Sequence, residues 1–584
     1  MDFRFLVRHW LNLSITIRGL FRSKPPTNVT FWQHFIRLLV RRPVPAIAAL
    51  YWYLTKRKVR ARNRLRRASA DLSFAYDLWK SRNENPSALA VRAKAAMDGW
   101  KRKPRFSILL HSMSGDSSEA LERSMQSLER QLYREWNVAE QANTTKLNVD
   151  AVDGDFIIPL RAGDQLSETA LYRFAEALQN HPDAVILYVD EDHIDARGRR
   201  SRPWFKPRWN QELFLAQDYL SSAVAIESRL ARRAATLGGD EVGALVLEAT
   251  SLAKNAIVHV PHVLTHLASK EEPEPGRLDI VARHLSRRGA TCAPGAFGTV
   301  KVEWPLPDEL PLVTMIIPTK DKLQLLRPCI DSLLRRTDYP AFEMLIVDNA
   351  SVNRRTLDYF DEIGANPKVR VLRYREPFNY SAINNFAARH ARGSYLCLLN
   401  NDTEVVEPSW LTELMRYAVR SDVGAVGAKL LYEDGSIQHA GVVVGIGDAA
   451  GHPHRFLPAG RPGYFRMAHV PQFISAVTGA CLVVEKSKFE AVGGLDEEKL
   501  AVAYNDVDLC LKLEAAGWRN VYVPHAVLLH HESKSRGNDM APAQFGRYSR
   551  ELTVLQERWK TKTYEDPLHN PNLDRYSETY VLRL

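Results

Sequence analysis

Three short segments of this sequence occur twice, in the same order. The first copies are residues 105–110, 154–160 and 258–262, and the second copies are residues 312–317, 393–399 and 521–525. Each is a short apolar run bounded by Gly, Pro or polar residues, a pattern typical of a strand buried in a sheet. Helical patterns lie between the runs, and two such long copies indicate two domains of one fold rather than a solenoid. We therefore expect an α/β chain with two tandem, mostly parallel, Rossmann-related sheets.

The two copies differ in length and in their polar residues. Phe106 and Gly154 are 48 positions apart, whereas Val313 and Gly393 are 80 positions apart, so the first copy lacks 32 residues. An ungapped match sets Gly163 against Asp402 and Gly243 against Asp506, although Asp164 leaves room for a shift of one residue. We interpret the first copy as degenerate, with a structural, acceptor-binding or assembly role.

The repeats divide the chain into five expected regions. These are a basic amphipathic helical region at 1–104, a degenerate domain at 105–288, a linker at 289–310, a second domain at 311–560 and a C-terminal tail at 561–584.

Positive charge is concentrated at the N-terminal end. Residues 1–67 contain sixteen Lys and Arg but one acid, whereas the whole chain has 79 basic and 68 acidic residues. Apolar patches alternate with these charges, which favours a helix on an anionic membrane surface, with packing against the protein body as the alternative. No nucleic-acid-binding module accompanies the charge, so we expect no nucleic acid partner. No apolar run reaches the roughly 18 residues of a membrane span.

Five scattered cysteines without metal-ligand spacing indicate buried thiols in a reducing compartment. Together with the basic segment, they predict a cytoplasmic protein that is peripheral on the inner face of the cytoplasmic membrane.

Polar residues follow the predicted strands of the second copy. Pro318-Thr319 ends the first strand, Asp348 ends the next, and Asn400-Asn401-Asp402 ends a third. The carboxyl ends of parallel strands share one edge of a sheet, so these groups are expected to meet there. Asp506 opens a helix and His530 follows the last strand of the copy.

The order and spacing of these motifs resemble inverting family 2 glycosyltransferases of the GT-A fold. In particular, they resemble bacterial polysaccharide and O-antigen proteins that have two such domains. The resemblance implies a divalent cation, Mn²⁺ or Mg²⁺, held by Asp402 and by His530 in preference to His531, and a general base at Asp506. It implies donor binding by Pro318, Thr319, Asp321, Asp348, Asn379, Asn385, Asn400 and Asn401. Helix capping explains Asn379 nearly as well.

The sequence departs from the family pattern at two places. Asn400 and Asn401 replace acids of a metal-binding triplet, and Asn505 replaces the first acid of a pair. The resemblance still implies sugar transfer from a UDP- or dTDP-sugar, with dTDP-rhamnose as one candidate, to a glycan or lipid-linked acceptor. Two alternatives stay open: a non-catalytic binding scaffold, and a sugar-nucleotide nucleotidyltransferase. A nucleotidyltransferase would have a Gly-rich loop after the first strand, but this sequence has Pro318-Thr319-Lys320 in that place.

Overall fold

A computed structural model gives the three-dimensional structure. It describes residues 44, 48, 51–52, 68, 75–112, 116–141, 147–239, 241–254, 256–268, 276–531 and 542–583. Most of the basic segment 1–67 therefore lies outside the described residues, and so do the predictions made for it. In the part of the chain that is described, no helix combines the length and the apolar character needed to cross a membrane.

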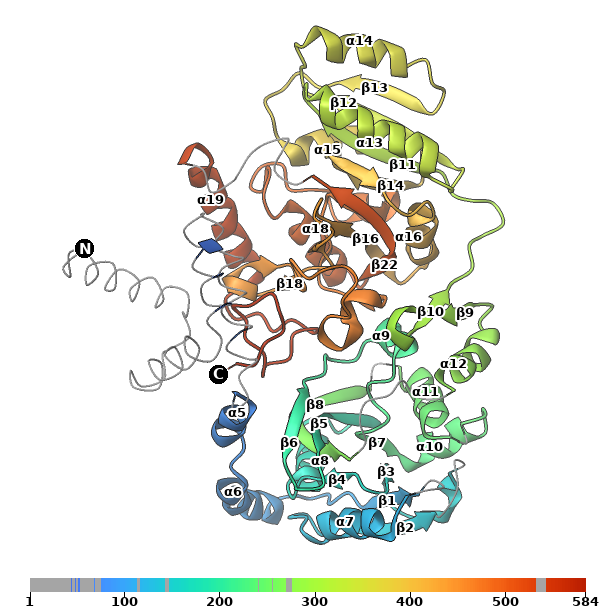
Figure 1. Ribbon diagram of the computed structural model, residues 1–584, viewed down its shortest axis with the longest axis vertical. Helices are drawn as coiled ribbons and strands as arrows, with labels where there is room; N and C mark the ends of the chain where they lie inside the picture. Colours follow the sequence, from blue (N-terminus) through green and yellow to red (C-terminus); the bar gives the residue numbers. More distant parts are fainter. Residues whose placement is uncertain are drawn as a thin grey trace, which may run out of the picture.

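The first domain is built on an eight-stranded sheet and occupies the lower half of Figure 1. Its strand order is β2-β1-β3-β7-β5-β8-β4, with β6 paired to β5. The strands are β1 (Phe106–His111), β2 (Trp136–Gln141), β3 (Phe156–Arg161), β4 (Gln165–Leu166), β5 (Ile186–Ile194), β6 (Arg200–Trp204), β7 (Val224–Glu227) and β8 (Ile257–Leu267). The helices are α7 (Ser118–Glu129), α8 (Ala170–Asn180), α9 (Gln211–Ala216), α10 (Ser228–Ala235), α11 (Val242–Ala253) and α12 (Arg277–Ser286).

The second domain has a ten-stranded sheet in the order β13-β12-β11-β14-β21-β16-β22-β15, with β17 on β16 and β20 on β22. Its longer strands are β11 (Val313–Thr319), β12 (Phe342–Asp348), β13 (Val369–Arg373), β14 (Tyr395–Leu399), β16 (Val423–Leu431), β21 (Cys481–Glu485) and β22 (Arg519–His530). Short strands are β15 (Thr403–Val405), β17 (Ile437–His439), β18 (Val443–Val444), β19 (Ala450–Gly451) and β20 (Gln472–Phe473). The helices are α13 (Leu323–Arg336), α14 (Arg354–Ile363), α15 (Tyr380–His390), α16 (Trp410–Ala418), α17 (Lys486–Ala491), α18 (Asn505–Ala515) and α19 (Pro542–Trp559).

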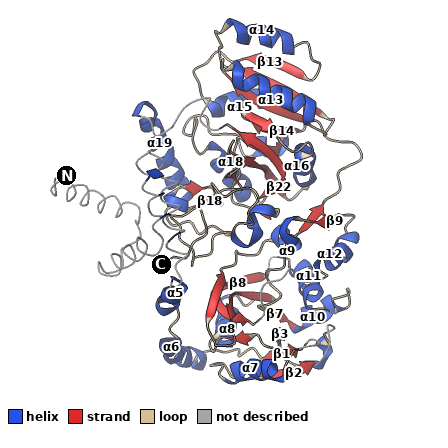
Figure 2. Cartoon of the chain, in the orientation of Figure 1, coloured by secondary structure: helices blue, strands red, loops and turns tan. Residues whose placement is uncertain are grey.

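The two strand orders match position by position. The path β2-β1-β3-β7-β5-β8-β4 corresponds to β12-β11-β14-β21-β16-β22-β15, and every parallel or antiparallel pairing agrees. Along these paths β7 and β21 run antiparallel to both neighbours, and the end strands β4 and β15 run antiparallel to β8 and β22. The remaining strands of each path are parallel, so both sheets are mixed but mostly parallel. The predicted α/β class with two tandem related domains is therefore confirmed. The residues missing from the first copy correspond to β13, α14 and α15, which are labelled in the upper part of Figure 2.

The equivalence extends to single hydrogen bonds. Gly154 N donates to Ser107 Oγ at 2.9 Å, and Gly393 N donates to Thr314 Oγ1 at 2.9 Å. In both domains the glycine precedes the central strand and lies directly against the backbone of its neighbour. A Cβ on Gly393 would lie 2.5 Å from Leu312 O, closer than real side chains approach.

Gly393→Ala and Gly154→Ala are each expected to destabilise their own domain by about 1–3 kcal/mol, because the added methyl group overpacks rigid backbone. Thermal unfolding of the full chain measures this effect. Gly460→Ala is the matched control, since no atom lies within 4 Å of its added Cβ. Unchanged midpoints for both variants would contradict the close approach of the strands.

The N-terminal helices pack on the first domain, whereas the C-terminal segment joins the two domains. The region predicted at 1–104 contains α5 (Ala75–Asn83) and α6 (Pro86–Asp98), and Trp79 of α5 packs on Phe205. The predicted linker contains the hairpin β9 (Thr291–Pro294) and β10 (Val300–Glu303). The predicted tail crosses between the domains, where Asn570 Nδ2 donates to Asp190 of β5 at 2.9 Å (Figure 1).

Candidate functional site

The polar residues predicted to meet do lie at the carboxyl ends of adjacent strands. Thr319 and Asp348 end β11 and β12 and are paired in register. Asn401 follows β14, and its Nδ2 donates to Thr319 Oγ1 at 2.9 Å. Thr403 of β15 is paired with His530 at the end of β22. The sheet order thus brings residues from four distant parts of the sequence to one edge.

Asp506 and Asp402 belong to one connected network. Gly479 N donates to Asp506 Oδ2 at 2.8 Å, and Tyr380 Oη donates to Gly479 O at 2.9 Å. Tyr380 Oη also lies 3.5 Å from Asn400 Oδ1, and Asn400 Nδ2 lies 3.2 Å from His530 Nε2. His530 Nε2 in turn lies 3.2 Å from Asp402 Oδ1. A chain of contacts through Gly479, Tyr380, Asn400 and His530 thus links the two carboxylates.

Asp402 and His530 form a buried pair with unused bonding capacity. Their side chains are 1% and 7% exposed. Asp402 Oδ1 and His530 Nδ1 are buried without a partner of acceptable hydrogen-bond geometry. A buried carboxylate oxygen without a donor is costly, and a bound cation would relieve that cost. Over the described ranges, however, no group of three or more His, Cys, Asp or Glu side chains gathers as a metal site.

The two adjacent histidines have different surroundings. His531 Nε2 lies 2.8 Å from Glu404 Oε1, and His531 Nδ1 lies 2.5 Å from Glu433 Oε1. His530 instead faces Asp402, because successive side chains alternate between the two faces of a strand. His530 is therefore the histidine that lies beside Asp402, and its preference over His531 as a metal ligand remains a prediction.

Asp348 is fully buried and already has partners. It forms an ion pair with Arg373 of β13 and accepts a hydrogen bond from Ser351 N at 2.9 Å. Asp321 Oδ1 accepts from Val352 N and Asn353 N at 3.0 and 2.8 Å, at the start of α14. Both carboxylates thus shape the loop after β12, and their contact with a donor remains a prediction.

Asn379 and Asn385 hold a neighbouring turn against α15. Asn379 Oδ1 accepts from Ala382 N at 2.9 Å, and Asn379 Nδ2 donates to Glu497 O at 2.8 Å. Asn385 exchanges hydrogen bonds with Leu495, at 2.8 and 2.9 Å. Capping accounts for Asn379, as the alternative interpretation stated, and donor binding by either residue stays untested.

The two acids that open α18 are used differently. Asp508 is fully buried and accepts from Arg558 and from Trp559 Nε1 of α19, both at 2.8 Å. It therefore fastens α19 to the domain. Asp506 is only partly buried and contacts its own helix start and Gly479. Asn505 Nδ2 donates to Ser381 Oγ at 3.0 Å, so the amide that replaces an acid has a packing role.

The first domain retains part of the same pattern. Gln165 is paired with His266, as Thr403 is paired with His530, so Asp164 occupies the place of Asp402. The ungapped match of Gly163 with Asp402 was therefore wrong by one residue, because strand pairing sets the register. Gly243 is the second residue of α11, as Asp506 is of α18, which agrees with the predicted loss of the base.

A dense ionic network fills this edge of the first domain. Asp192 lies 2.6 Å from His266 Nδ1 and accepts from Tyr76 Oη of α5 at 2.6 Å. Arg200 bridges Asp192 and Glu84, each at 2.7 Å. Burial by itself would raise the pKa of Asp192, but hydrogen bonding from His266 and the charge of Arg200 lower it. Asp192 and Glu191 thus form salt bridges, with Arg200 and Lys206, and α5 covers this edge of the first domain.

Arg200→Gln is expected to destabilise the first domain by about 3 kcal/mol, because it leaves the buried Asp192 without its cation. Hydrogen exchange of β5 measures this loss. Arg199→Gln is the matched control: Arg199 pairs with Asp195 at the surface, where an ion pair contributes little. Equal exchange rates in the two variants would show that the network does not stabilise the domain.

Part of the second domain matches a known protein family. Residues 314–489 match the model of the family described as "Glycosyl transferase family 2". The second domain therefore belongs to glycosyltransferase family 2. The matched span begins in β11 and ends in α17, so it includes Asp402 but not Asp506 or His530.

Curated relatives extend beyond this domain. The chain is 40% identical to "Uncharacterized protein y4gI" of Sinorhizobium fredii over 78% of this chain and 52% of that protein. It is 34% identical to "O-antigen biosynthesis protein RfbC" of Myxococcus xanthus over 94% of this chain and 42% of that protein. A shorter match, 48% identical over 65 residues, covers 11% of this chain and 21% of "N-acetylglucosaminyl-diphospho-decaprenol L-rhamnosyltransferase" of Mycobacterium tuberculosis. The chain spans about half the length of the first two relatives.

The sequence did not point to three residues that contact the candidate site residues. Tyr380 and Gly479 connect Asp506 to Asn400, and Arg373 neutralises Asp348. Tyr380 directly follows Asn379, which the resemblance had singled out. Nothing in the sequence, however, indicates that its hydroxyl reaches a carbonyl 99 positions away.

Proposed function

We propose that the second domain is an inverting glycosyltransferase that moves a sugar from a nucleoside-diphosphate donor to a glycan or lipid-linked acceptor. The observation that carries this proposal is the network from Asp506 to Asp402, which places an accessible carboxylate and a buried carboxylate–imidazole pair at one edge of the sheet. Membership in glycosyltransferase family 2 agrees with this arrangement.

Asp506 takes the role of general base. The acceptor hydroxyl oxygen attacks the anomeric carbon, the bond to the diphosphate oxygen breaks, and the hydroxyl proton passes to the Asp506 carboxylate. The hydrogen bond from Gly479 N holds Oδ2 of this carboxylate in place. A single displacement of this kind inverts the anomeric configuration.

Asp402 and His530 would hold Mn²⁺ or Mg²⁺. Asp402 Oδ1, which has no hydrogen-bond donor, and His530 Nε2, which lies 3.2 Å from it, are oxygen and nitrogen ligands that fit such an ion. When bound, a divalent cation neutralises the negative charge that develops on the departing diphosphate. Asn400 and Asn401 keep neutral amides in place of acids, so we expect modest metal affinity.

The donor we favour is a UDP- or dTDP-sugar, with dTDP-rhamnose as a candidate. Asp348 lies at the end of β12, where it would accept from the ring N–H of a uracil or thymine once Arg373 moves aside. The rhamnosyltransferase named among the relatives supports this candidate. The name of the Myxococcus relative supports a role in O-antigen or related surface polysaccharide synthesis.

The expected location follows from the same reasoning. A cytoplasmic body that associates with the inner face of the cytoplasmic membrane through the basic segment 1–67 would meet a lipid-linked acceptor there. We propose no nucleic acid partner.

A thermal-shift panel of UDP-, dTDP- and GDP-sugars, with and without Mn²⁺, tests the proposal. We expect one uridine or thymidine sugar to raise the melting temperature, and Mn²⁺ to enlarge that shift. Stabilisation by none of these compounds would refute the donor site. Release of pyrophosphate from a sugar phosphate and a nucleoside triphosphate would instead favour a nucleotidyltransferase.

A further inference from the structure

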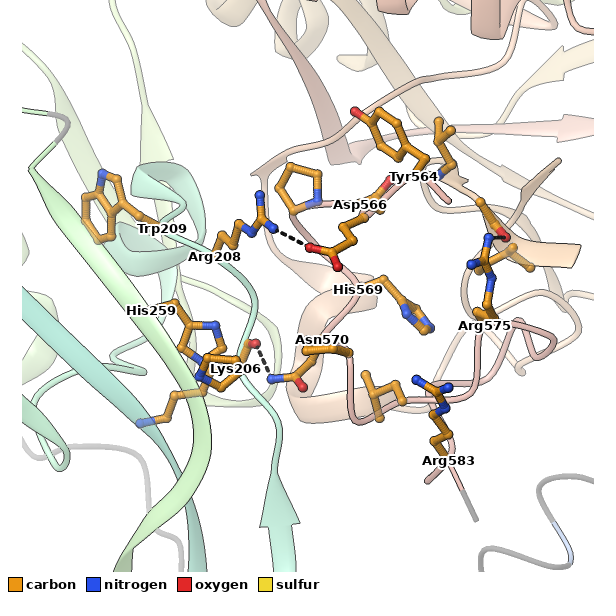
Figure 3. Close-up of a pocket in the computed structure, with 18 of the residues that line it drawn as sticks. Lys206, Arg208, Trp209, His259, Tyr564, Asp566, His569, Asn570, Arg575 and Arg583 are labelled. Carbon is orange, nitrogen blue, oxygen red and sulfur yellow. Dashed lines mark hydrogen bonds and ion pairs between the residues drawn. The ribbon is translucent and has the colours of Figure 1, made fainter. Parts of the chain in front are cut away.

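A cavity of about 550 Å³ lies between the two domains, on the side of the C-terminal segment (Figure 3). The first domain contributes residues around Arg208 and His259, and the second domain contributes Val444–Ile446 next to β18. Residues 563–583 close the remaining side. The volume falls in the range of small-molecule sites and is far larger than one water or one bare anion requires.

The C-terminal segment that forms this wall is firmly attached on both sides. Asn570 Nδ2 donates to Asp190 and to Lys206 O, each at 2.9 Å, and Asn572 Nδ2 donates to Pro261 O at 2.9 Å. On the other side, Val444 N donates to Asp566 Oδ2 at 2.7 Å. The cavity is therefore a preformed space between packed elements rather than an accidental gap at a loose end.

Basic groups around the cavity have bonding capacity that the protein does not use. His569 Nε2 and Arg575 Nε are buried and have no hydrogen-bond partner among the described residues, although Arg575 Nη2 donates to Gly445 O and Thr561 O. Arg583 is exposed and forms no ion pair in the described part of the chain. In Figure 3 these three side chains lie around the same space. Arg208 adds a fourth donor, paired at 3.1 Å with Glu565 in a solvent-exposed contact that contributes little.

The acids that line the cavity do not offset this surplus. Asp566 accepts from Val444 N and Leu568 N, so backbone donors already satisfy its carboxylate. Burial raises the pKa of Asp566 to about 6, which further reduces its negative charge near neutral pH. Burial also lowers the pKa of His569 to about 4, with the charge of Arg575 adding to the effect. The imidazole is then neutral and can donate through one ring nitrogen.

We propose that this cavity binds a saccharide that carries an anionic group, either a phosphoryl group or a carboxylate. The guanidinium group of Arg583 is suited to bidentate contact with either group, and Arg575 can add its Nε as one further donor. The apolar faces of Ile257, Pro261 and Leu573 leave room for a sugar ring beside it. The site lies in the first domain, the C-terminal segment and the β18 turn, so it does not depend on the transfer reaction.

Calorimetric titration of the full chain tests this site with glucose 1-phosphate, glucuronate, inorganic phosphate and glucose. We expect at least one anionic sugar to bind more tightly than glucose and than phosphate alone, and the stronger of the two identifies the anionic group. Arg583→Gln and His569→Leu should each weaken that binding by about tenfold or more. Arg335→Gln, which removes an exposed arginine of α13, should leave it unchanged.

The Asp402→Asn variant separates this site from the donor site. If the anionic sugar still binds to the Asp402→Asn variant but not to the Arg583→Gln variant, the cavity is the binding site. Binding lost in Asp402→Asn but kept in Arg583→Gln would place the sugar in the second domain and overturn the proposal. Equal binding of glucose and the anionic sugars, or no binding of any, would overturn it as well.

Discussion

Replacement of Asp506 by asparagine is expected to reduce sugar transfer by about 10²- to 10⁴-fold, the contribution typical of a general base. Asparagine has nearly the same shape, and its Oδ1 can still accept from Gly479 N. The variant should therefore fold normally and bind the nucleotide donor with unchanged affinity. Turnover and donor affinity, measured on the same preparation, separate a chemical role from a structural one.

Two further variants sharpen this test. Glu498→Gln removes a carboxylate from the nearby 496–499 turn and should leave turnover unchanged. Asp508→Asn should lower stability instead, because it removes the ion pair with Arg558 that fastens α19. If Asp506→Asn retained turnover within a few-fold of the natural chain, another residue would have to be the base, or the domain would be a scaffold.

Replacement of Asp402 by asparagine is expected to abolish the effect of Mn²⁺ on nucleoside-diphosphate binding. Asp402 is the one acid in the Asn400-Asn401-Asp402 sequence, and an amide oxygen is a much weaker ligand for a hard cation. Titration of the nucleoside diphosphate with and without Mn²⁺ should show tenfold or greater tightening by the metal in the natural chain only. Turnover should fall with it.

The adjacent histidines provide a matched pair for this prediction. His530→Gln should weaken the Mn²⁺ effect, because His530 lies beside Asp402. His531→Gln should not, because His531 lies between Glu404 and Glu433. Loss of the metal effect in His531→Gln alone would contradict the arrangement at the end of β22.

The repeat in the sequence predicted the architecture because buried strands tolerate few residue types. Gly154 and Gly393 match since each lies where a methyl group would collide with a neighbouring backbone. The polar residues at strand ends predicted the edge of the sheet for a similar reason. The carboxyl ends of parallel strands lie at the same edge of a sheet, so Thr319, Asp348 and Asp402 could be grouped before any distance was known.

Other features depended on contacts between distant segments. The match of Gly163 with Asp402 was wrong because the pairing of Gln165 with His266 sets the register, and no local pattern shows it. The sequence explained Asn379 nearly as well by helix capping as by donor binding, and only its hydrogen bonds with Ala382 and Glu497 show what it contacts. Tyr76 and Arg200, which cover the edge of the first domain, are hydrogen-bonded to each other although they are 124 positions apart.

The sequence by itself determined the class of fold, the two copies and the residues that end each strand, because strand burial and turn chemistry act over a few neighbouring positions. The tertiary structure decided which carboxylate faces which partner: that Asp506 connects through Gly479 and Tyr380 to Asn400, that His530 rather than His531 faces Asp402, and that the C-terminal segment encloses a cavity. These outcomes depend on the direction of side chains after long-range packing. Packing of that kind leaves no periodic signal in the chain.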